Sequence, residues 1–167
     1  MAYTSPTTRS TNDLITAAIW NADMVENIKW LYNGNPGCRV YHNTTQSMTG
    51  SSDNTVLFNT ERYDTDTMHS TVSNTGRITV TTAGTYMFHA QIDWATAPGS
   101  NVMFLRLNGA TKVASVNWTG SSDTCEITTI YAMVATDYME LLVNPATTQT
   151  INSTANYSPE FMAHRLG

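Results

Sequence analysis

An acidic segment is the part of the sequence best suited to binding a metal ion. Residues 61–66, with the sequence Glu-Arg-Tyr-Asp-Thr-Asp, place Asp64 and Asp66 two positions apart in a predicted loop. Two carboxylates at this spacing, completed by loop carbonyls, supply the hard oxygen ligands that Ca²⁺ prefers. However, the segment lacks the repeated Asp pattern and the glycine of an EF-hand loop, and Asp-rich loops more often accept hydrogen bonds from backbone N–H groups. Calcium binding and turn capping are both open for Asp64 and Asp66, and turn capping is the favoured interpretation.

The histidines and serines show no pattern of nucleophilic catalysis. His42, His69, His89 and His164 are far apart in the sequence, and none belongs to a His-x-x-x-His or His-Glu-x-x-His arrangement. No serine lies in a Gly-x-Ser-x-Gly turn. Because a catalytic histidine needs a nucleophile and an orienting carboxylate, we expect a protein that is not an enzyme. His89 and His164 fall on predicted strands, where they are expected to face solvent or an interface.

Two tryptophans lie close to the starts of predicted loops. Trp118 is the better candidate for an exposed aromatic side chain on which a sugar could stack. Trp94 continues the apolar alternation of its predicted strand, which favours a place in the core or at an assembly axis. Trp118 is therefore the candidate ligand contact, and Trp94 is a candidate core or assembly residue.

The charge balance argues against a nucleic-acid partner. The formal charge is −5, the pI is about 5.1, and the eight Lys and Arg residues are scattered along the chain rather than clustered. No apolar run is long enough to span a bilayer, and the N-terminus lacks the basic and then apolar pattern of a secretory signal. We expect a protein made in the cytoplasm, with no membrane-inserted segment.

Only two cysteines are present, Cys38 and Cys125. They have no metal-ligand spacing and make a poor disulfide framework. Two buried free thiols and one disulfide between strands of opposite sheets are both open, and free thiols are favoured.

The N-terminal part of the chain has a pattern of its own. Residues 1–15 are polar and are expected to form an extended arm. Thr16 is a suitable N-cap for an amphipathic helix over residues 16–33. Residues 34–37, with the sequence Gly-Asn-Pro-Gly, end this helix and form a linker.

The predicted helix carries one apolar stripe. Trp20, Met24, Ile28 and Leu31 follow one another at spacings of 4, 4 and 3, which places them on one face. A single helix of this length is marginal in water on its own. The stripe must therefore pack on sister helices around a symmetry axis, on the rest of the chain, or on another protein.

Residues 38–167 are predicted to be all-β. The clearest strand is Thr85–Trp94, in which Tyr86, Phe88, Ala90, Ile92 and Trp94 alternate with polar or less apolar residues. Asn108-Gly109 is a strong signal for a two-residue hairpin between two further strands. About ten short strands separated by turn clusters predict a sandwich, jelly roll or closed barrel.

The β-region resembles the C1q/TNF-like jelly-roll family. Five blocks similar to family motifs occur in the family's order: Thr55–Phe58 followed by an acidic loop at Asp64, Ala83–Phe88, Leu105–Gly109, Thr136–Leu141 and Pro159–Leu166. Two departures affect turn detail rather than the fold, because Thr136 and Ala163 stand where the family usually has Gly. The N-terminal segment Asp13–Asn21 resembles the short helical lead found ahead of C1q-like domains in phage structural proteins.

The resemblance implies a homotrimer with apolar jelly-roll faces meeting at a three-fold axis. The residues expected at trimer or assembly contacts are Trp20, Met24, Ile28, Leu31, Tyr86, Phe88 and Trp94. The resemblance also implies a structural place on a virion surface, as a capsid decoration or cement protein or as a tail-attached appendage, held to capsid or tail proteins by the N-terminal arm and helix. The alternative is an adhesin module of a tail fibre that binds a host receptor or surface glycan.

Overall fold

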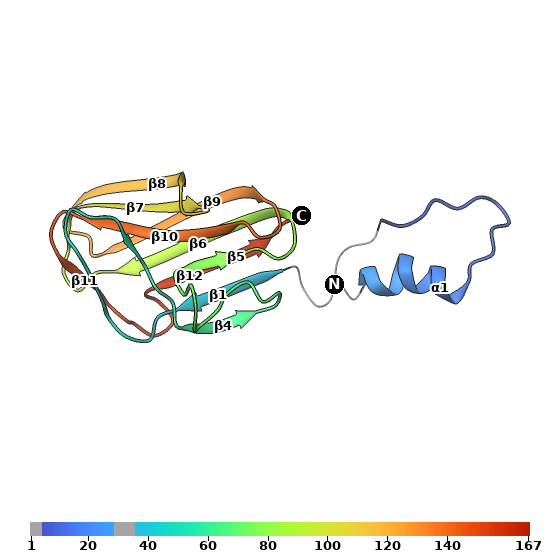
Figure 1. Cartoon of the computed structure of the whole chain (residues 1–167), viewed down its shortest axis with the longest axis horizontal. Helices are drawn as coiled ribbons and strands as arrows, with labels where there is room; N and C mark the ends of the chain where they lie inside the picture. The colour runs from blue at the N-terminus through green and yellow to red at the C-terminus, as the bar shows by residue number, and fades with distance from the viewer. Residues whose placement is uncertain (1–4, 29–35) are drawn as a thin grey trace. The chain divides into compact units, whose positions relative to one another are not determined.

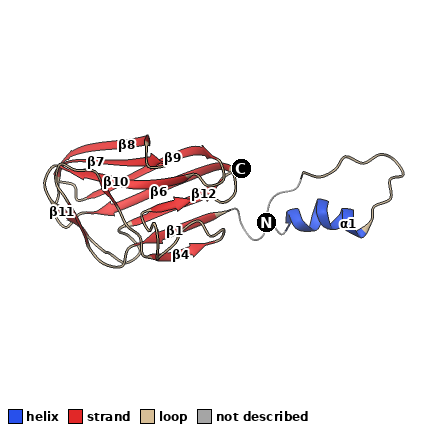
Figure 2. Cartoon of the chain, in the orientation of Figure 1, coloured by secondary structure: helices blue, strands red, loops and turns tan. Residues whose placement is uncertain are grey.

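The computed structural model describes residues 5–28 and 36–167 (Figure 1). The chain divides into two compact units, Met1–Asn35 and Pro36–Gly167. Among the described residues, the first unit contains helix and the second contains strands (Figure 2). None of the described helices has the length and apolar character needed to cross a membrane.

The N-terminal helix begins where its cap predicts. α1 covers Ala17–Trp20, and the Thr16 hydroxyl accepts a hydrogen bond from the Ile19 backbone N–H at 3.3 Å. A π-helical turn, η1, follows over Asn21–Val25, and helical structure continues over residues 26–28. The π turn was not predicted, because apolar periodicity does not separate a local i→i+5 turn from a regular helix. Residues 29–33 of the predicted helix, Leu31 among them, lie outside the described residues.

The arm bends back onto this helix within the N-terminal unit. The Arg9 guanidinium forms an ion pair with the Asp23 carboxylate at 2.9 Å, and the Thr7 backbone N–H donates to the same carboxylate at 3.4 Å. Asn12 has φ +75° and the Ser10 N–H donates to Asp13 Oδ2 at 2.7 Å, which forms a turn between arm and helix. The described part of the arm is therefore folded against the helix rather than extended and free.

The β-domain consists of two antiparallel five-stranded sheets and a small two-stranded one. The first sheet has the order β4-β1-β12-β6-β9, with bounds Thr60–Asp64, Gly37–Tyr41, Glu160–Arg165, Gly84–Asp93 and Thr124–Met133. The second has the order β3-β10-β7-β8, with β5 also paired to β10, and bounds Asn54–Thr55, Tyr138–Pro145, Gly99–Leu107, Thr111–Gly120 and Arg77–Thr79. β2 (Gln46–Met48) pairs with β11 (Gln149–Ile151). The two large sheets form the layers of a sandwich (Figure 1).

The core lies between the two large sheets. Phe58, Phe88 and Phe161 are fully buried, with the Phe161 ring centroid 5.7 Å from that of Phe58 and 6.2 Å from that of Phe88. Tyr86 and Phe88 are 0% exposed and Trp94 is 1% exposed. Their alternation was predicted correctly, but their assignment to a trimer or assembly contact needs correction. They fill the interior of one domain, so no second copy can reach them while that domain is folded.

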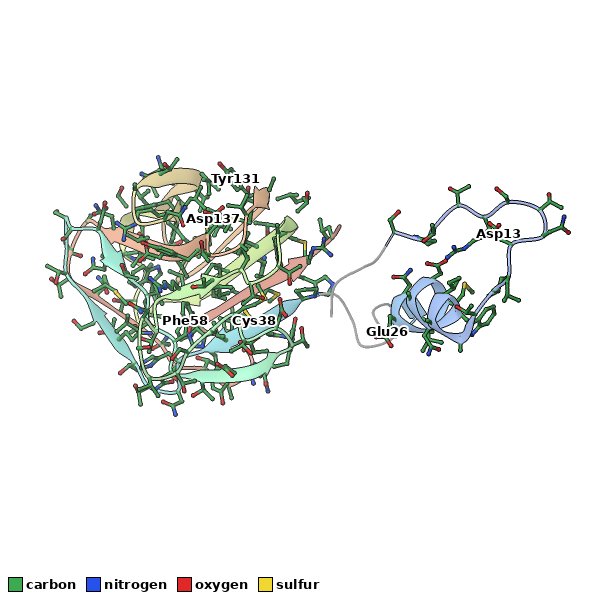
Figure 3. The ribbon with its side chains drawn as sticks, turned by 45° about the vertical axis from the view of Figure 1, so that its right-hand side comes forward. Asp13, Glu26, Cys38, Phe58, Tyr131 and Asp137 are labelled. Atoms are coloured by element: carbon green, nitrogen blue, oxygen red, sulfur yellow. The ribbon has the colours of Figure 1, made fainter. Side chains whose placement is uncertain are left out.

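Both cysteines are free and buried, which corrects the disulfide alternative. Cys38 on β1 (Figure 3) and Cys125 on β9 belong to the same sheet, with β12 and β6 between them. Three strand spacings of about 4.8 Å place these strands about 14 Å apart, well beyond the Cα separation that a disulfide spans. Burial raises the pKa of the Cys125 thiol to about 12. Burial, reinforced by the charge of Asp64, also raises the pKa of the Cys38 thiol.

Two turns between strands contain non-glycine residues with a positive φ angle. Asn108 and Gly109 have φ +50° and +70° and lie in the turn between β7 and β8, so the predicted hairpin is confirmed. Its loop has three residues, 108–110, rather than the predicted two, because Leu107 pairs with Thr111. Thr136, in the turn between β9 and β10, has φ +80°, a left-handed conformation that a β-branched residue rarely adopts. This is the position at which the C1q/TNF-like family usually has Gly. The backbone keeps the conformation that Gly would favour, although the side chain is a threonine.

Candidate functional site: the outward face of the β4-β1-β12-β6-β9 sheet

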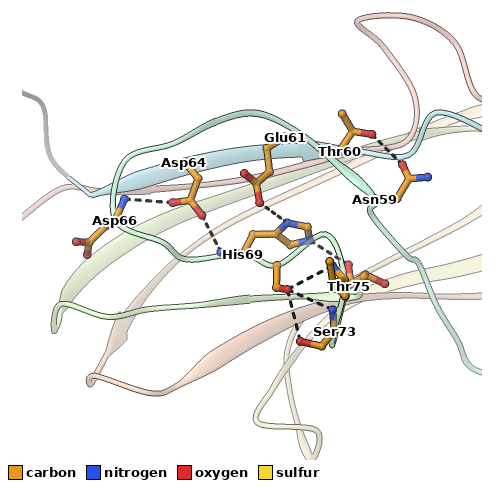
Figure 4. Close-up of polar contacts among 10 residues, drawn as sticks. Asn59, Thr60, Glu61, Asp64, Asp66, His69, Ser73 and Thr75 are labelled. Atoms are coloured by element: carbon orange, nitrogen blue, oxygen red, sulfur yellow. Dashed lines mark hydrogen bonds and ion pairs between the residues drawn. The ribbon is translucent and has the colours of Figure 1, made fainter.

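The acidic segment is a turn-capping network (Figure 4). The Asp64 carboxylate accepts from the backbone N–H groups of Asp66 at 3.1 Å and His69 at 2.8 Å. The Asp66 carboxylate accepts from the hydroxyls of Thr81 and Thr82. Within the described residues, no group of three or more His, Cys, Asp or Glu side chains is placed to hold a metal ion. Calcium at Asp64 and Asp66 stays a prediction, while their role in capping is visible.

The predicted acidic loop is in part a strand. Residues 60–64 form β4, which pairs with β1, and a bulge between Arg39 and Val40 of β1 places an extra β4 residue in the pairing. On the loop that follows, the His69 ring is buried, with Nδ1 3.0 Å from Glu61 Oε1 and Nε2 3.2 Å from the Thr75 carbonyl oxygen (Figure 4). These contacts tie the loop to β4 and include no nucleophile.

Trp118 is half-buried and packs against the core rather than standing free on the surface. Its register partner on β7, Asn101, is 1% exposed. The indole N–H groups of Trp94 and Trp118 and both amide atoms of Asn101 are buried without a hydrogen-bond partner among the described residues. Contact between Trp118 and a ligand stays a prediction.

The surface with the most unusual composition is the outward face of the β4-β1-β12-β6-β9 sheet. Successive residues of a strand point to opposite sides, so the residues that alternate with the core residues lie on this face. Strand register arranges them in three rows across the sheet. The polar row contains Tyr41, Glu160, Gln91 and Glu126; the central row contains Tyr63, Arg39, Met162, His89 and Thr128; and the apolar row contains His164, Met87 and Ile130.

Large apolar side chains lie uncovered on the outward face. Ile130 is 60% exposed and Tyr63 is 43% exposed, while Met87 and Met162 are half-buried between their neighbours. Exposed isoleucine beside two methionines on one sheet face is typical of a surface that another protein covers. The outward face is therefore a candidate assembly surface.

A buried ion triad stiffens one side of the outward face. The Glu160 carboxylate, only 3% exposed, forms ion pairs with the guanidinium groups of Arg39 and Arg62. The Arg62 guanidinium also lies 4.3 Å from the centroid of the Tyr41 ring. A carboxylate this buried needs such partners, because an unpaired buried charge is costly. The triad holds two arginines in defined positions on the face.

Both strand histidines lie on the same face, in agreement with the prediction for solvent-facing or interface positions. His89 is half-buried in the central row, and its Nδ1 lies 2.8 Å from the Thr128 hydroxyl. His164 is exposed in the apolar row, between Gly37 and Met87. No carboxylate contacts the His89 ring among the described residues, so the pair with Thr128 lacks the orienting group of a catalytic triad.

Solved structures with the same architecture include TNF and C1q domains. Eiger TNF from S. frugiperda matches with a TM-score of 0.61 and 14% identity over 80% of this chain and 94% of that one. The globular domain of the zebrafish complement 1qA protein matches with a TM-score of 0.56 and 16% identity over 80% and 98%. Murine APRIL at pH 8.0 matches with a TM-score of 0.64 and 9% identity over 79% and 99%.

The domain is a TNF/C1q-like jelly roll. This confirms the fold that the sequence blocks indicate. No protein-family model matches the chain, and no curated protein matches it in sequence. The similarity therefore lies in the three-dimensional arrangement of the jelly roll, and at 8–16% identity it establishes fold alone.

Sequence reasoning missed the outward face. The assembly contact was assigned to the strongly apolar alternate positions of the strand, such as Tyr86 and Phe88, but these residues form the core. The signal for the face was the set of intervening residues, because Met87, Ile130 and Met162 are more apolar than the solvent side of a strand requires. In the helix, the described members of the predicted stripe, Trp20, Met24 and Ile28, are 53%, 43% and 56% exposed. Their role as an assembly contact stays a prediction.

Proposed function

We propose that the chain is a non-enzymatic, homotrimeric structural protein of a phage virion surface, and that the outward face forms the trimer contact. The observation that carries the trimer is the uncovered apolar surface around Ile130, Met87 and Met162 on a TNF/C1q-like sheet. The fold supports it, since the jelly-roll family that the chain resembles assembles as trimers. The virion location is supported by the resemblance of Asp13–Asn21 to the helical leads of phage structural proteins.

The trimer is tested by placing a charge on the outward face. Ile130→Lys should leave the domain folded and convert the trimer to monomer, because burying an unpaired ammonium group at an interface is costly. Val72→Lys is the matched control, since Val72 is 90% exposed in a loop. Light scattering measures the oligomeric state of the wild type and of both variants, and circular dichroism shows whether each variant is folded. A wild-type protein that stays a monomer of about 18 kDa at micromolar concentration would refute the trimer.

The N-terminal unit is suited to attachment. Its described residues contribute no side chain to an apolar core, and Leu14, Ile15 and Trp20 are 80%, 59% and 53% exposed. An apolar surface of this kind is stable when a partner covers it. We infer that the arm and helix dock on a capsid or tail protein of the particle, with decoration and tail attachment as the two arrangements.

Attachment is tested by deleting residues 1–35, which leaves the β-domain whole. The truncated chain should fold and keep the oligomeric state of the wild type, but should not incorporate into particles. Incorporation at the wild-type level would contradict the attachment role.

A host-binding module is the second candidate, and one observation favours it. At the end of the sandwich where β6 leads into β7, the buried polar atoms of Trp94, Asn101 and Trp118 have no protein partner among the described residues. Gly99 and Gly120, paired across β7 and β8, have open space where a Cβ would lie. Binding on a glycan array that Trp118→Ala removes, with the fold intact, would support this function over a purely structural one.

A further inference from the structure

We infer that a recess around Arg77, on the solvent side of the β3-β10-β7-β8 sheet, binds an acidic sugar through the carboxylate of that sugar. The Arg77 recess is lined by Arg77, Tyr138 and Glu140 and by residues of the segments 55–57 and 74–76. The inference goes beyond the proposed function, because neither the trimer contact nor the N-terminal attachment uses this sheet.

Two strands that follow one another along the same edge of β10 build the recess. Arg77 of β5 pairs with Glu140, and Thr55 of β3 pairs with Leu142, two residues further along β10. The turn before β5 lies close against β3, since a Cβ on Gly76 would come within 2.6 Å of Thr55 Cγ2. Only glycine fits there without a shift of its neighbours, so the two walls of the recess are held in close contact.

Arg77 is a cation without an anionic partner in the protein. Its guanidinium carbon lies 4.4 Å from the centroid of the Tyr138 ring. Among the described residues, no ion pair includes Arg77 and no hydrogen bond uses its side-chain N–H groups. The donors of a guanidinium lie in its plane, so stacking holds the group in place and leaves them free for bidentate contact with a carboxylate.

The carboxylates around the recess already have partners. Glu140 Oε2 lies 3.0 Å from Arg106 Nε, and Arg106 pairs with β10 on the side opposite β5. Two further carboxylates on adjoining segments are also engaged, namely Asp137 with Asn108 Nδ2 at 2.8 Å and Glu61 with His69 Nδ1 at 3.0 Å. A carboxylate bound at Arg77 therefore meets a Glu140 charge that Arg106 offsets.

The rest of the lining suits the ring of a sugar. Asn74 and Thr75 supply an amide and a hydroxyl, and Leu57, which is 45% exposed, supplies an apolar surface. A sugar ring presents both hydroxyl groups and an apolar C–H face, so it can use both kinds of contact. The volume of about 420 Å³ lies within the range of about 300–1,000 Å³ that is typical of small-molecule pockets.

A nucleic acid or another extended polyanion matches this surface less well. Arg106 and Lys112 continue the row of Arg77 and Glu140 across β7 and β8. However, Arg106 is paired with Glu140, and the chain as a whole carries a formal charge of −5. Binding of a polyanion needs several clustered cations. Recognition in the recess depends instead on direct contact between one carboxylate and Arg77.

The test uses pairs of glycans that differ only in the charge of the carboxylate: oligogalacturonate and its methyl ester, and sialyllactose and its methyl ester. Calorimetry on the full chain should show that the acid of at least one pair binds about tenfold or more tightly than its ester. Arg77→Gln should abolish this preference. Arg77→Lys should also weaken binding, because a lysine keeps the charge but lacks the planar fork of donors.

Lys112→Gln is the matched control. It removes a second cation of the same row, whose Nζ also lies over an aromatic ring, 4.0 Å from the centroid of Phe104. The affinity of this variant for the acid should stay within about twofold of the wild type. Circular dichroism shows whether each variant is folded.

Three results would overturn the inference. The first is that the folded wild type binds neither acid, and the second is that it binds acid and ester equally. The third is that Arg77→Gln and Lys112→Gln lose affinity equally, for heparin or a DNA duplex as well, which would indicate a general polyanion surface. Because one protomer builds the recess, Ile130→Lys should still bind the acid, so failure of the trimer and failure of the recess are distinguishable. Trp118→Ala should also still bind it, which separates the recess from the Trp118 end of the sandwich.

Discussion

The two faces of the β4-β1-β12-β6-β9 sheet come from the same strands and differ in composition and exposure. On β6, Phe88 and Ala90 point inward and are fully buried, whereas Met87 and His89 between them point outward and keep part of their surface exposed. The inward face is almost purely apolar, with Cys38 and Phe161 among its members. The outward face mixes methionine, isoleucine, histidine and an ion triad.

In the proposed trimer, this difference separates the residues that stabilise the fold from those that stabilise the contact between copies. The inward face removes apolar area from water within one chain, so it stabilises the domain whatever its oligomeric state. The outward face gains burial only when a second molecule covers it, so its contribution depends on concentration. Substitutions at neighbouring positions of one strand should therefore act on different equilibria.

Phe88→Ala should have the largest effect on folding. Removing a fully buried phenylalanine leaves a cavity, and the free energy of unfolding should fall by about 3–5 kcal/mol. Chemical denaturation of the variant and the wild type at the same concentration measures this loss. A loss below about 1 kcal/mol would mean that the inward face does not carry the stability assigned to it.

Cys125 should be nearly inert toward thiol reagents in the folded protein. Its pKa is raised to about 12 by burial, and only the thiolate reacts. At pH 8 the folded state should hold roughly a thousandfold less thiolate than the unfolded chain. Because the folded state favours the protonated thiol, this residue's stabilisation is complete below the unfolded pKa and is lost as the pH rises toward about 12. Alkylation followed by mass spectrometry, with and without denaturant, measures the reactivity of the Cys125 thiol. Fast labelling of the native protein at pH 8 would show that the structure around Cys125 opens.

Met87→Ala should have the smallest effect on folding and still act on assembly. Met87 is half-buried on the outward face, so the unfolding free energy of the monomeric domain should change by less than about 1 kcal/mol. The trimer should dissociate at a higher protein concentration, because Met87 lies between Ile130 and His164 in the apolar row. Dilution measured by light scattering separates the two effects, and an unchanged dissociation curve would remove Met87 from the contact.

The sequence was most informative where local chemistry sets the conformation. Asn108-Gly109 predicted its hairpin, because few residues adopt the positive φ angles of that turn. Thr16 predicted the start of the helix, because its hydroxyl accepts from the Ile19 N–H. In contrast, the π turn at Asn21–Val25 and the short strands β2 and β11 carry no local signal, and pairing with distant residues decides the two strands.

The candidate site could not be predicted from the periodicity of apolar residues alone. Alternation showed that Tyr86 and Phe88 share one side of a strand, but not whether that side meets the second sheet or a second protomer. The acidic segment likewise offered oxygen ligands, and only the folded chain showed the backbone N–H groups and hydroxyls that occupy Asp64 and Asp66.

By itself, the sequence determined the all-β class, the ordered jelly-roll blocks, the capped helix and the alternation of β6, since these follow from short-range residue preferences. Only the tertiary structure decided which face of the sheet is core and which is surface, and that Cys38 and Cys125 lie too far apart to pair. It also brought Arg39, Arg62 and Glu160 together, although Arg62 and Glu160 are 98 residues apart in the chain. The physical reason is that strand order and register are long-range properties, set when the whole sandwich buries its apolar surface at once.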